Sequence, residues 1–93
     1  MIASFRDRET EKLWRSGKCR RLPGDIGRRA FRKLAILNAA VALENLRVPP
    51  GNQLELLSRD RAGQHSIRVN DQYRVCFRWR DGNAFDVEIV DYH

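Results

Sequence analysis

The chain has 93 residues, a formal net charge of +6 and a sequence pI of about 10.1. This length allows one domain with a modest core and excludes two, so we expect a single domain over residues 1–93. The balance of 42% hydrophobic and 32% charged residues excludes a disordered chain. A domain this basic is expected to bind a polyanion or an acidic protein. The alternative, that the excess charge only keeps the chain in solution, is less favoured.

Cysteine and histidine usage argues against a metal centre. Cys19 and Cys76 form no paired motif, and only two histidines are present, so no set of ligands has zinc-site spacing. We expect neither a metal nor a cofactor. The opening MIASFRDRET contains no long apolar stretch, which predicts no signal peptide and no membrane span. A cytoplasmic protein with reduced thiols is therefore expected.

The first elements in chain order are a short apolar opener and a helix. MIASF is compatible with an edge strand. Residues 6–18, RDRETEKLWRSGK, predict a helix that stops at Gly17.

A longer second helix is predicted over residues 26–46, with Asp25 as its cap. Apolar side chains recur at helical spacing and should face the core: Phe31, Leu34, Leu37 and Val41. Pro-Pro-Gly at 49–51 ends this half of the chain.

A basic stripe occupies the other face of this predicted helix, formed by Arg28, Arg29, Arg32 and Lys33. Three interpretations are open. The stripe touches RNA through nonspecific charge, docks an acidic segment of a partner protein, or is a solvated helix face, the commonest role of such runs.

Beyond residue 53 the apolar period changes to two, which is typical of strands. Strands are predicted over residues 54–57, 65–69, 73–79 and 85–92, with a turn over 58–63. Helices followed by strands predict an α+β fold in which two N-terminal helices pack on one face of a small, mainly antiparallel sheet.

The alternation also predicts the strand register, because a slip of one residue would turn every side chain over. Val69 should lie opposite Tyr73 across a three-residue loop at 70–72. A second three-residue loop at 81–83 should bring Trp79 near Phe85.

This register places Arg68 directly opposite Arg74, an uncompensated repulsion, whereas Arg78 faces Asp86 as an ordinary ion pair. Tyr92 falls diagonally beside Arg74. Either the two arginines splay into water, or a bound phosphate removes their repulsion, since guanidinium forks suit its oxygens.

Three stretches together carry a family resemblance: PPGN, DRAGQHSIRVNDQYRVCFRW and the final VEIVDYH. With them the chain resembles the HigB toxins of bacterial toxin–antitoxin pairs, within the RelE superfamily. The resemblance extends over nearly the whole chain and is strongest over residues 49–93.

The resemblance implies a RelE-like fold and a ribosome-dependent endoribonuclease that enters the A site of the 70S ribosome and cuts the mRNA being translated. It also implies a HigA-type helix-turn-helix antitoxin, with operator DNA bound only by the toxin–antitoxin complex. The implied site residues are Arg74, Asp91, Tyr92 and His93. A lysine that some relatives carry in the turn is Ser58 here, with Arg59 beside it, and a histidine that some relatives carry is Glu55 here.

Metal-independent RNA cleavage needs a base for the 2′-hydroxyl, cations for the phosphate and an acid for the leaving oxygen. His93 is expected to be the general acid or the general base. Arg74 is expected to clamp the phosphate with help from Arg68, and Tyr92 to stack on or orient a nucleotide. Asp91 is expected to orient His93 or Arg74.

Other polar residues of this half are expected to have lesser roles. Arg59 and Arg61 are predicted to contact the RNA backbone, because phosphate contacts position a strand without reading its sequence. His65 is expected to be a surface strand residue.

Two other functions are compatible with the residues. In the first, Ser58 and Glu55 mark a decayed active site, and the chain acts as a noncatalytic, antitoxin-binding co-repressor of its own operon. In the second, the chain poisons gyrase like a sister branch of the superfamily. The ending Asp-Tyr-His argues against that branch.

Overall fold

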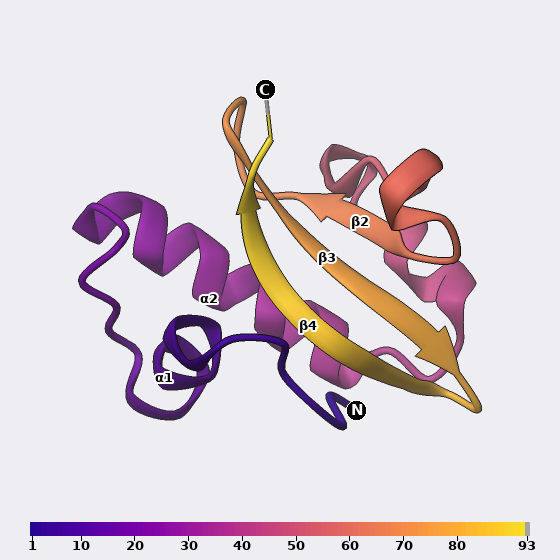
Figure 1. Ribbon diagram of the computed structural model, residues 1–93, viewed down its shortest axis with the longest axis horizontal. Coiled ribbons are helices and arrows are strands. Elements are labelled where there is room, and N and C mark those ends of the chain that lie inside the picture. The colour runs from indigo at the N-terminus through magenta and orange to yellow at the C-terminus, as the bar shows by residue number, and fades with distance from the viewer. Residues whose placement is uncertain (93) are drawn as a thin grey trace.

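The computed structural model describes residues 1–92, and this part of the chain forms two α-helices and a four-stranded sheet (Figure 1). The helices are α1 (Arg8–Ser16) and α2 (Gly24–Ala39). The strands are β1 (Glu55–Leu56), β2 (His65–Arg68), β3 (Tyr73–Arg80) and β4 (Asn83–Asp91). They lie in the order β1-β2-β3-β4, with every neighbouring pair antiparallel. The expected α+β architecture is confirmed.

Helix α1 begins and ends where its sequence favours. The Asp7 carboxylate accepts a hydrogen bond from the Thr10 N–H at 3.2 Å, which caps the first turn. At the other end Gly17 has a φ of 77° and donates its N–H to the Leu13 carbonyl at 2.8 Å. A left-handed glycine of this kind is a common helix stop, so the predicted end at Gly17 is confirmed.

Helix α2 starts differently from the prediction. Pro23 is the residue before its first turn, and no side chain caps the helix. Asp25 lies within that first turn instead, where a negative charge stabilises the helix through the exposed N–H groups. The prediction of Asp25 as the cap is therefore wrong.

The far end of α2 also differs, since the helix stops at Ala39 and Ala40 is extended. The Asn45 side-chain oxygen accepts hydrogen bonds from the N–H groups of Val41 (3.0 Å) and Ala42 (2.9 Å). These bonds open a separate 3₁₀ turn at Leu43–Arg47. As a result Val41, expected in the core, is 80% exposed.

The first hairpin has the register that the alternation predicts. Arg68 pairs with Arg74 and Ile67 with Val75, and the Val69 N–H donates to the Tyr73 carbonyl at 2.9 Å. Ile67, Val69 and Val75 are buried in the core.

The second hairpin is tighter than predicted. Arg80 pairs with Asn83 and Trp79 with Ala84, so the loop contains only Asp81 and Gly82. Both loop residues have positive φ, 53° and 78°, as a two-residue type I′ turn requires. The expected three-residue loop is wrong, and Phe85 lies opposite Arg78, one residue away from Trp79.

A bulge in β4 restores the register further along this hairpin. Asp86 has a φ of 52°, and the pairing shifts between Cys76 and Arg78. The extra residue explains why the expected Arg78–Asp86 ion pair still forms, at 3.7 Å.

The N-terminal segment runs beside β4. Ile2 bridges Ala84 and Phe5 bridges Val87, both in the parallel direction, so the opener does line the sheet edge. Its pairing is limited to these isolated bridges.

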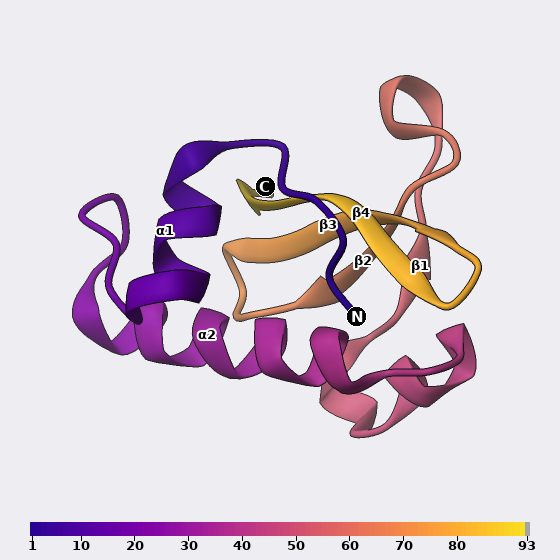
Figure 2. The same ribbon diagram turned by 90° about the horizontal axis from the view of Figure 1, so that it is seen from below.

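The core lies between the helices and one face of the sheet (Figure 2). Leu13 of α1, Leu34 and Leu37 of α2, and Phe77 and Val87 of the sheet are fully buried there. The opposite face, which carries Ser66, Arg74, Cys76 and Glu88, is called the second face below. Within residues 1–92, neither helix has the length and hydrophobicity needed to cross a membrane.

Candidate active site

Arg74 is the central cation of the second face, and its side chain is held from two sides. Its Nε donates to the Ser66 hydroxyl at 2.7 Å, and its Nη2 donates to the Gln53 carbonyl at 2.6 Å. Nη2 also lies 3.6 Å from the Glu55 carboxylate. The residue is only 9% exposed. The two hydrogen bonds position the guanidinium firmly, as an electrostatic catalyst requires.

Glu55 acquires a clear role in this arrangement. The resemblance marks Glu55 as one of two departures from the family pattern. In the structure it is the carboxylate partner of Arg74, while its own side chain is 57% exposed. Ser58, the other departure, is exposed and precedes the 3₁₀ turn Arg59–Arg61.

The predicted repulsion between Arg68 and Arg74 is compensated. The two residues are opposite each other, as expected, but Arg68 forms an ion pair with Asp71 and Arg74 one with Glu55. Each arginine therefore has its own carboxylate. Neither of the two outcomes expected from the sequence, splaying into water or a bound phosphate, is needed to explain the pair.

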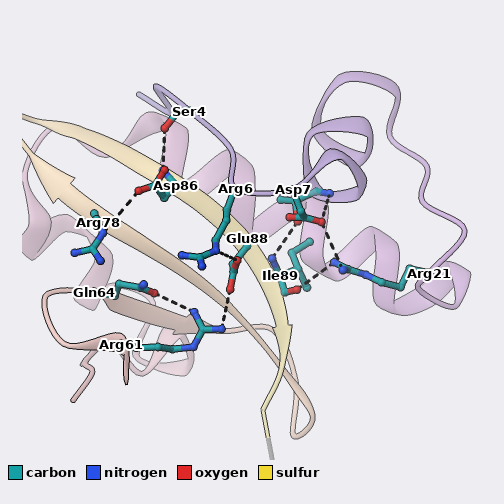
Figure 3. A network of polar contacts seen from close by, with 11 residues as sticks. Ser4, Arg6, Asp7, Arg21, Arg61, Gln64, Arg78, Asp86, Glu88 and Ile89 are labelled. Atoms are coloured by element: carbon teal, nitrogen blue, oxygen red, sulfur yellow. Dashed lines mark hydrogen bonds and ion pairs between the residues drawn. The ribbon is translucent and has the colours of Figure 1, made fainter. Parts of the chain in front are cut away.

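Arg61 belongs to an ion-pair network on the second face (Figure 3). Its Nη2 lies 2.8 Å from Glu88, and Arg6 contacts the same carboxylate at 3.2 Å. Arg61 Nη1 also donates to the Gln64 side-chain oxygen at 3.1 Å. Burial disfavours the charge on Arg61, but the hydrogen bond to Glu88 prevails, with smaller electrostatic help that includes Tyr92, and raises its pKa. Arg61 is thus anchored to the sheet, whereas its neighbour Arg59 is exposed.

The last described residues lie at the end of β4. Val90 pairs with Arg74, so Tyr92, two residues on, has the diagonal position that the register predicts. Tyr92 is 40% exposed, and its N–H donates to the Gln72 carbonyl at 2.6 Å. His93 lies outside the described residues.

Asp91 is placed differently from Tyr92. It pairs with Tyr73, so strand alternation directs it to the opposite side of the sheet from Arg74. Its carboxylate accepts a hydrogen bond from the Gln72 amide at 3.1 Å. The carboxylate that forms an ion pair with Arg74 is that of Glu55.

His65 sits away from this cluster. It pairs with Phe77, and the two rings stack with centroids 6.1 Å apart. Its Nδ1 is buried without a hydrogen-bond partner among the described residues, and burial lowers the pKa of the imidazole. His65 is half-buried, so its expected place as a surface residue is only partly met.

Sequence patterns locate the arginines of this site but miss the groups that hold them. The register puts Ser66 diagonally beside Arg74 on the second face, but the hydrogen bond between them was not expected from the sequence. The Gln53 carbonyl reaches Arg74 from a left-handed residue, with a φ of 45°, which no pattern in the sequence indicates.

Comparison with known proteins is consistent with these features. Residues 3–93 match the family model described as a RelE-like toxin of the type II toxin-antitoxin system HigB. The chain is 46% identical to Toxin HigB-1 of Vibrio cholerae serotype O1, over 92% of each chain. It is 33% identical to an uncharacterized protein of Haemophilus influenzae, over 86% of this chain and 80% of the other.

The family match covers nearly the entire chain, and the α+β fold is consistent with it. A toxin of this type is paired with an antitoxin, so a partner protein is implied. The chain belongs to the HigB family of RelE-like toxins of type II toxin–antitoxin systems.

Proposed function

We propose that the chain is a ribosome-dependent endoribonuclease that cleaves translated mRNA in the A site and is neutralised by a cognate HigA-type antitoxin. The observation that carries this proposal is the buried, prepositioned guanidinium of Arg74 in a chain of the HigB family. RelE-like toxins are generally endoribonucleases. An arginine held in place before the substrate arrives avoids the cost of reorganising during the reaction.

The cleavage proceeds without a metal in this proposal. A base removes the proton from the 2′-hydroxyl, whose oxygen attacks the adjacent phosphorus, while an acid protonates the departing 5′-oxygen. Arg74 stabilises the charge that develops on the phosphate, and Nη1 is the part of its fork that no described residue engages. His93 supplies proton transfer, since an imidazole titrates near neutral pH.

Tyr92 and Arg59 contribute substrate contacts. Tyr92 is 40% exposed at the edge of the second face, where an aromatic ring is available to stack on an unpaired base. Arg59 is exposed on the 3₁₀ turn and is suited to a backbone phosphate. Arg61 is proposed to have a supporting role without contacting the RNA, because its guanidinium is already bound to Glu88 and Gln64 of the sheet region.

A second candidate is a noncatalytic toxin-fold protein that acts with its antitoxin as a co-repressor at operator DNA. The ion pair between Arg74 and Glu55 favours it, because the carboxylate competes with a phosphate for the same guanidinium. Under this alternative, expression of the chain leaves transcripts intact.

Induction of the gene in bacteria, with and without the antitoxin gene, separates the two candidates. The nuclease hypothesis predicts growth arrest and new 5′ ends inside translated codons, both abolished by Arg74→Ala and by deletion of His93. Arrest with intact transcripts, or normal growth with toxin-dependent operator binding, would contradict it. Arg80→Ala on the same strand is the matched control, because Arg80 packs over the Phe85 ring, outside the proposed site.

A further inference from the structure

A basic cavity lies where α2 meets the end of β2. Its volume is about 350 Å³, and its wall is formed by Arg29, Arg32, Lys33, Ile36, Gly51, Arg68 and Val69. The four helical residues have the spacing i, i+3, i+4 and i+7, which puts their side chains on one stripe of the helix. The cavity therefore collects part of the basic stripe of α2 and joins it to Arg68 of the sheet.

The charges lining this cavity are unbalanced. Four of its seven residues are cations, and none is acidic. Arg68 does pair with Asp71, but that carboxylate is almost fully exposed, at 98%, and is easily exchanged for another anion. An anion in the cavity would face several donors at once.

Lys33 is the most constrained of these cations. Its ammonium donates to the Asn52 side-chain oxygen at 2.5 Å. Asn52 is fully buried, and its amide nitrogen donates to the Leu46 carbonyl at 3.1 Å. Burial, and then the charges of Arg29 and Arg68, lower the pKa of Lys33. The Lys33 ammonium is thus held by the neutral Asn52 side chain and repelled by the charges of Arg29 and Arg68.

We propose that this cavity binds a backbone phosphate of RNA. Guanidinium forks match phosphate oxygens in pairs, and a lysine adds a point charge. The choice of RNA rests on the proposed function and on one geometric fact: Arg68, which lines the cavity, is directly opposite Arg74. Arg68 thus links the cavity to the strand pair that carries Arg74, and in this proposal an RNA strand bound at Arg74 extends past Arg68 to the cavity.

Equilibrium binding of a short single-stranded RNA with 2′-O-methyl sugars, which cannot be cut at the blocked oxygen, tests the proposal. Fluorescence anisotropy over a series of salt concentrations is measured for the full chain, for Arg32→Gln and for Lys33→Gln. Arg28→Gln is the matched control, because it removes the same charge from the same helix outside this cavity. Arg32 is exposed, so its variant keeps the test decisive if the Lys33 variant folds poorly.

The expected result is a several-fold loss of affinity for each cavity variant, with a salt slope that is shallower by about 0.7 for each phosphate that the variant no longer neutralises. Equal losses for Arg28→Gln and Arg32→Gln would overturn the proposal in favour of diffuse charge. Unchanged RNA affinity together with a weakened antitoxin complex would overturn it in favour of an acidic protein segment. Because the assay uses uncleaved RNA without ribosomes, it can succeed even if the nuclease proposal fails.

Discussion

Arg74 illustrates what single residues contribute to this toxin. Alternation along β2 and β3 is enough to predict that it opposes Arg68. The same alternation cannot predict the Gln53 carbonyl or the Glu55 carboxylate, because the path of the segment before β2 depends on tertiary packing. The arginine is therefore predictable from the sequence, and its supporting contacts are not.

Glu55 gives a prediction about the substrate. Glu55→Gln should raise ribosome-dependent cleavage a few-fold, because a phosphate then no longer competes with a carboxylate 3.6 Å from Nη2. Glu44→Gln, an exposed site on the 3₁₀ turn Leu43–Arg47, controls for the change in net charge. Initial rates with purified ribosomes provide the measurement. A slower Glu55→Gln enzyme would mean that the carboxylate positions Arg74 instead of competing for it.

His65 gives a prediction about pH. Burial lowers its folded-state pKa below the usual 6.5, so the unfolded chain binds a proton first as the pH falls. The stability that neutral His65 contributes is then complete above about pH 6.5 and is lost as the pH falls below it. Urea unfolding between about pH 7.5 and about pH 5.5 should show a smaller stability loss for His65→Asn than for the native chain. Identical pH profiles would refute this role.

At the scale of elements, the strands and the end of the first helix are the predictable parts. A period of two and a left-handed glycine each leave a local signal, and the structure confirms both for the first hairpin and for Gly17. The end of α2 leaves no such signal in the sequence, because residues 39–43 favour a helix. The helix ends there because the Asn45 side chain accepts the N–H groups of Val41 and Ala42, and the helical pattern does not indicate these two bonds. The loop length of the second hairpin is ambiguous in the sequence. A three-residue loop, or a two-residue loop followed by the bulge at Asp86, gives the same pairing further along β3 and β4.

Two glycines should respond to alanine with opposite sign. Gly17→Ala should lower the free energy of unfolding by about 1 kcal/mol, because its φ of 77° is strained for a side chain. Gly27→Ala should raise it by roughly 0.5–1 kcal/mol, because Gly27 is inside α2 and a Cβ there meets nothing within 4 Å. Denaturant unfolding of both variants gives the comparison. Two changes of the same sign would contradict the assigned backbone roles.

At the scale of the whole molecule, the basic residues behind the net charge of +6 occupy two different surroundings. Some of these positive charges are paired on the second face, where Arg6 and Arg61 share Glu88. Others gather in the α2–β2 cavity without an acidic wall residue. Under the two proposals above, this distribution combines a positioned guanidinium with a surface for a polyanion, whereas composition alone predicts only the total charge.

The most direct test of the account is cleavage of a defined mRNA by the purified full chain, with and without programmed ribosomes. The native chain and Arg80→Ala should cut only when ribosomes are present, and Arg74→Ala should lose at least about 100-fold in rate. Arg74→Lys should recover little, because it keeps the charge but loses the fork. Thermal melting and antitoxin binding would verify that each variant is folded. Undiminished cutting by a folded Arg74→Ala chain would contradict the central role of this guanidinium.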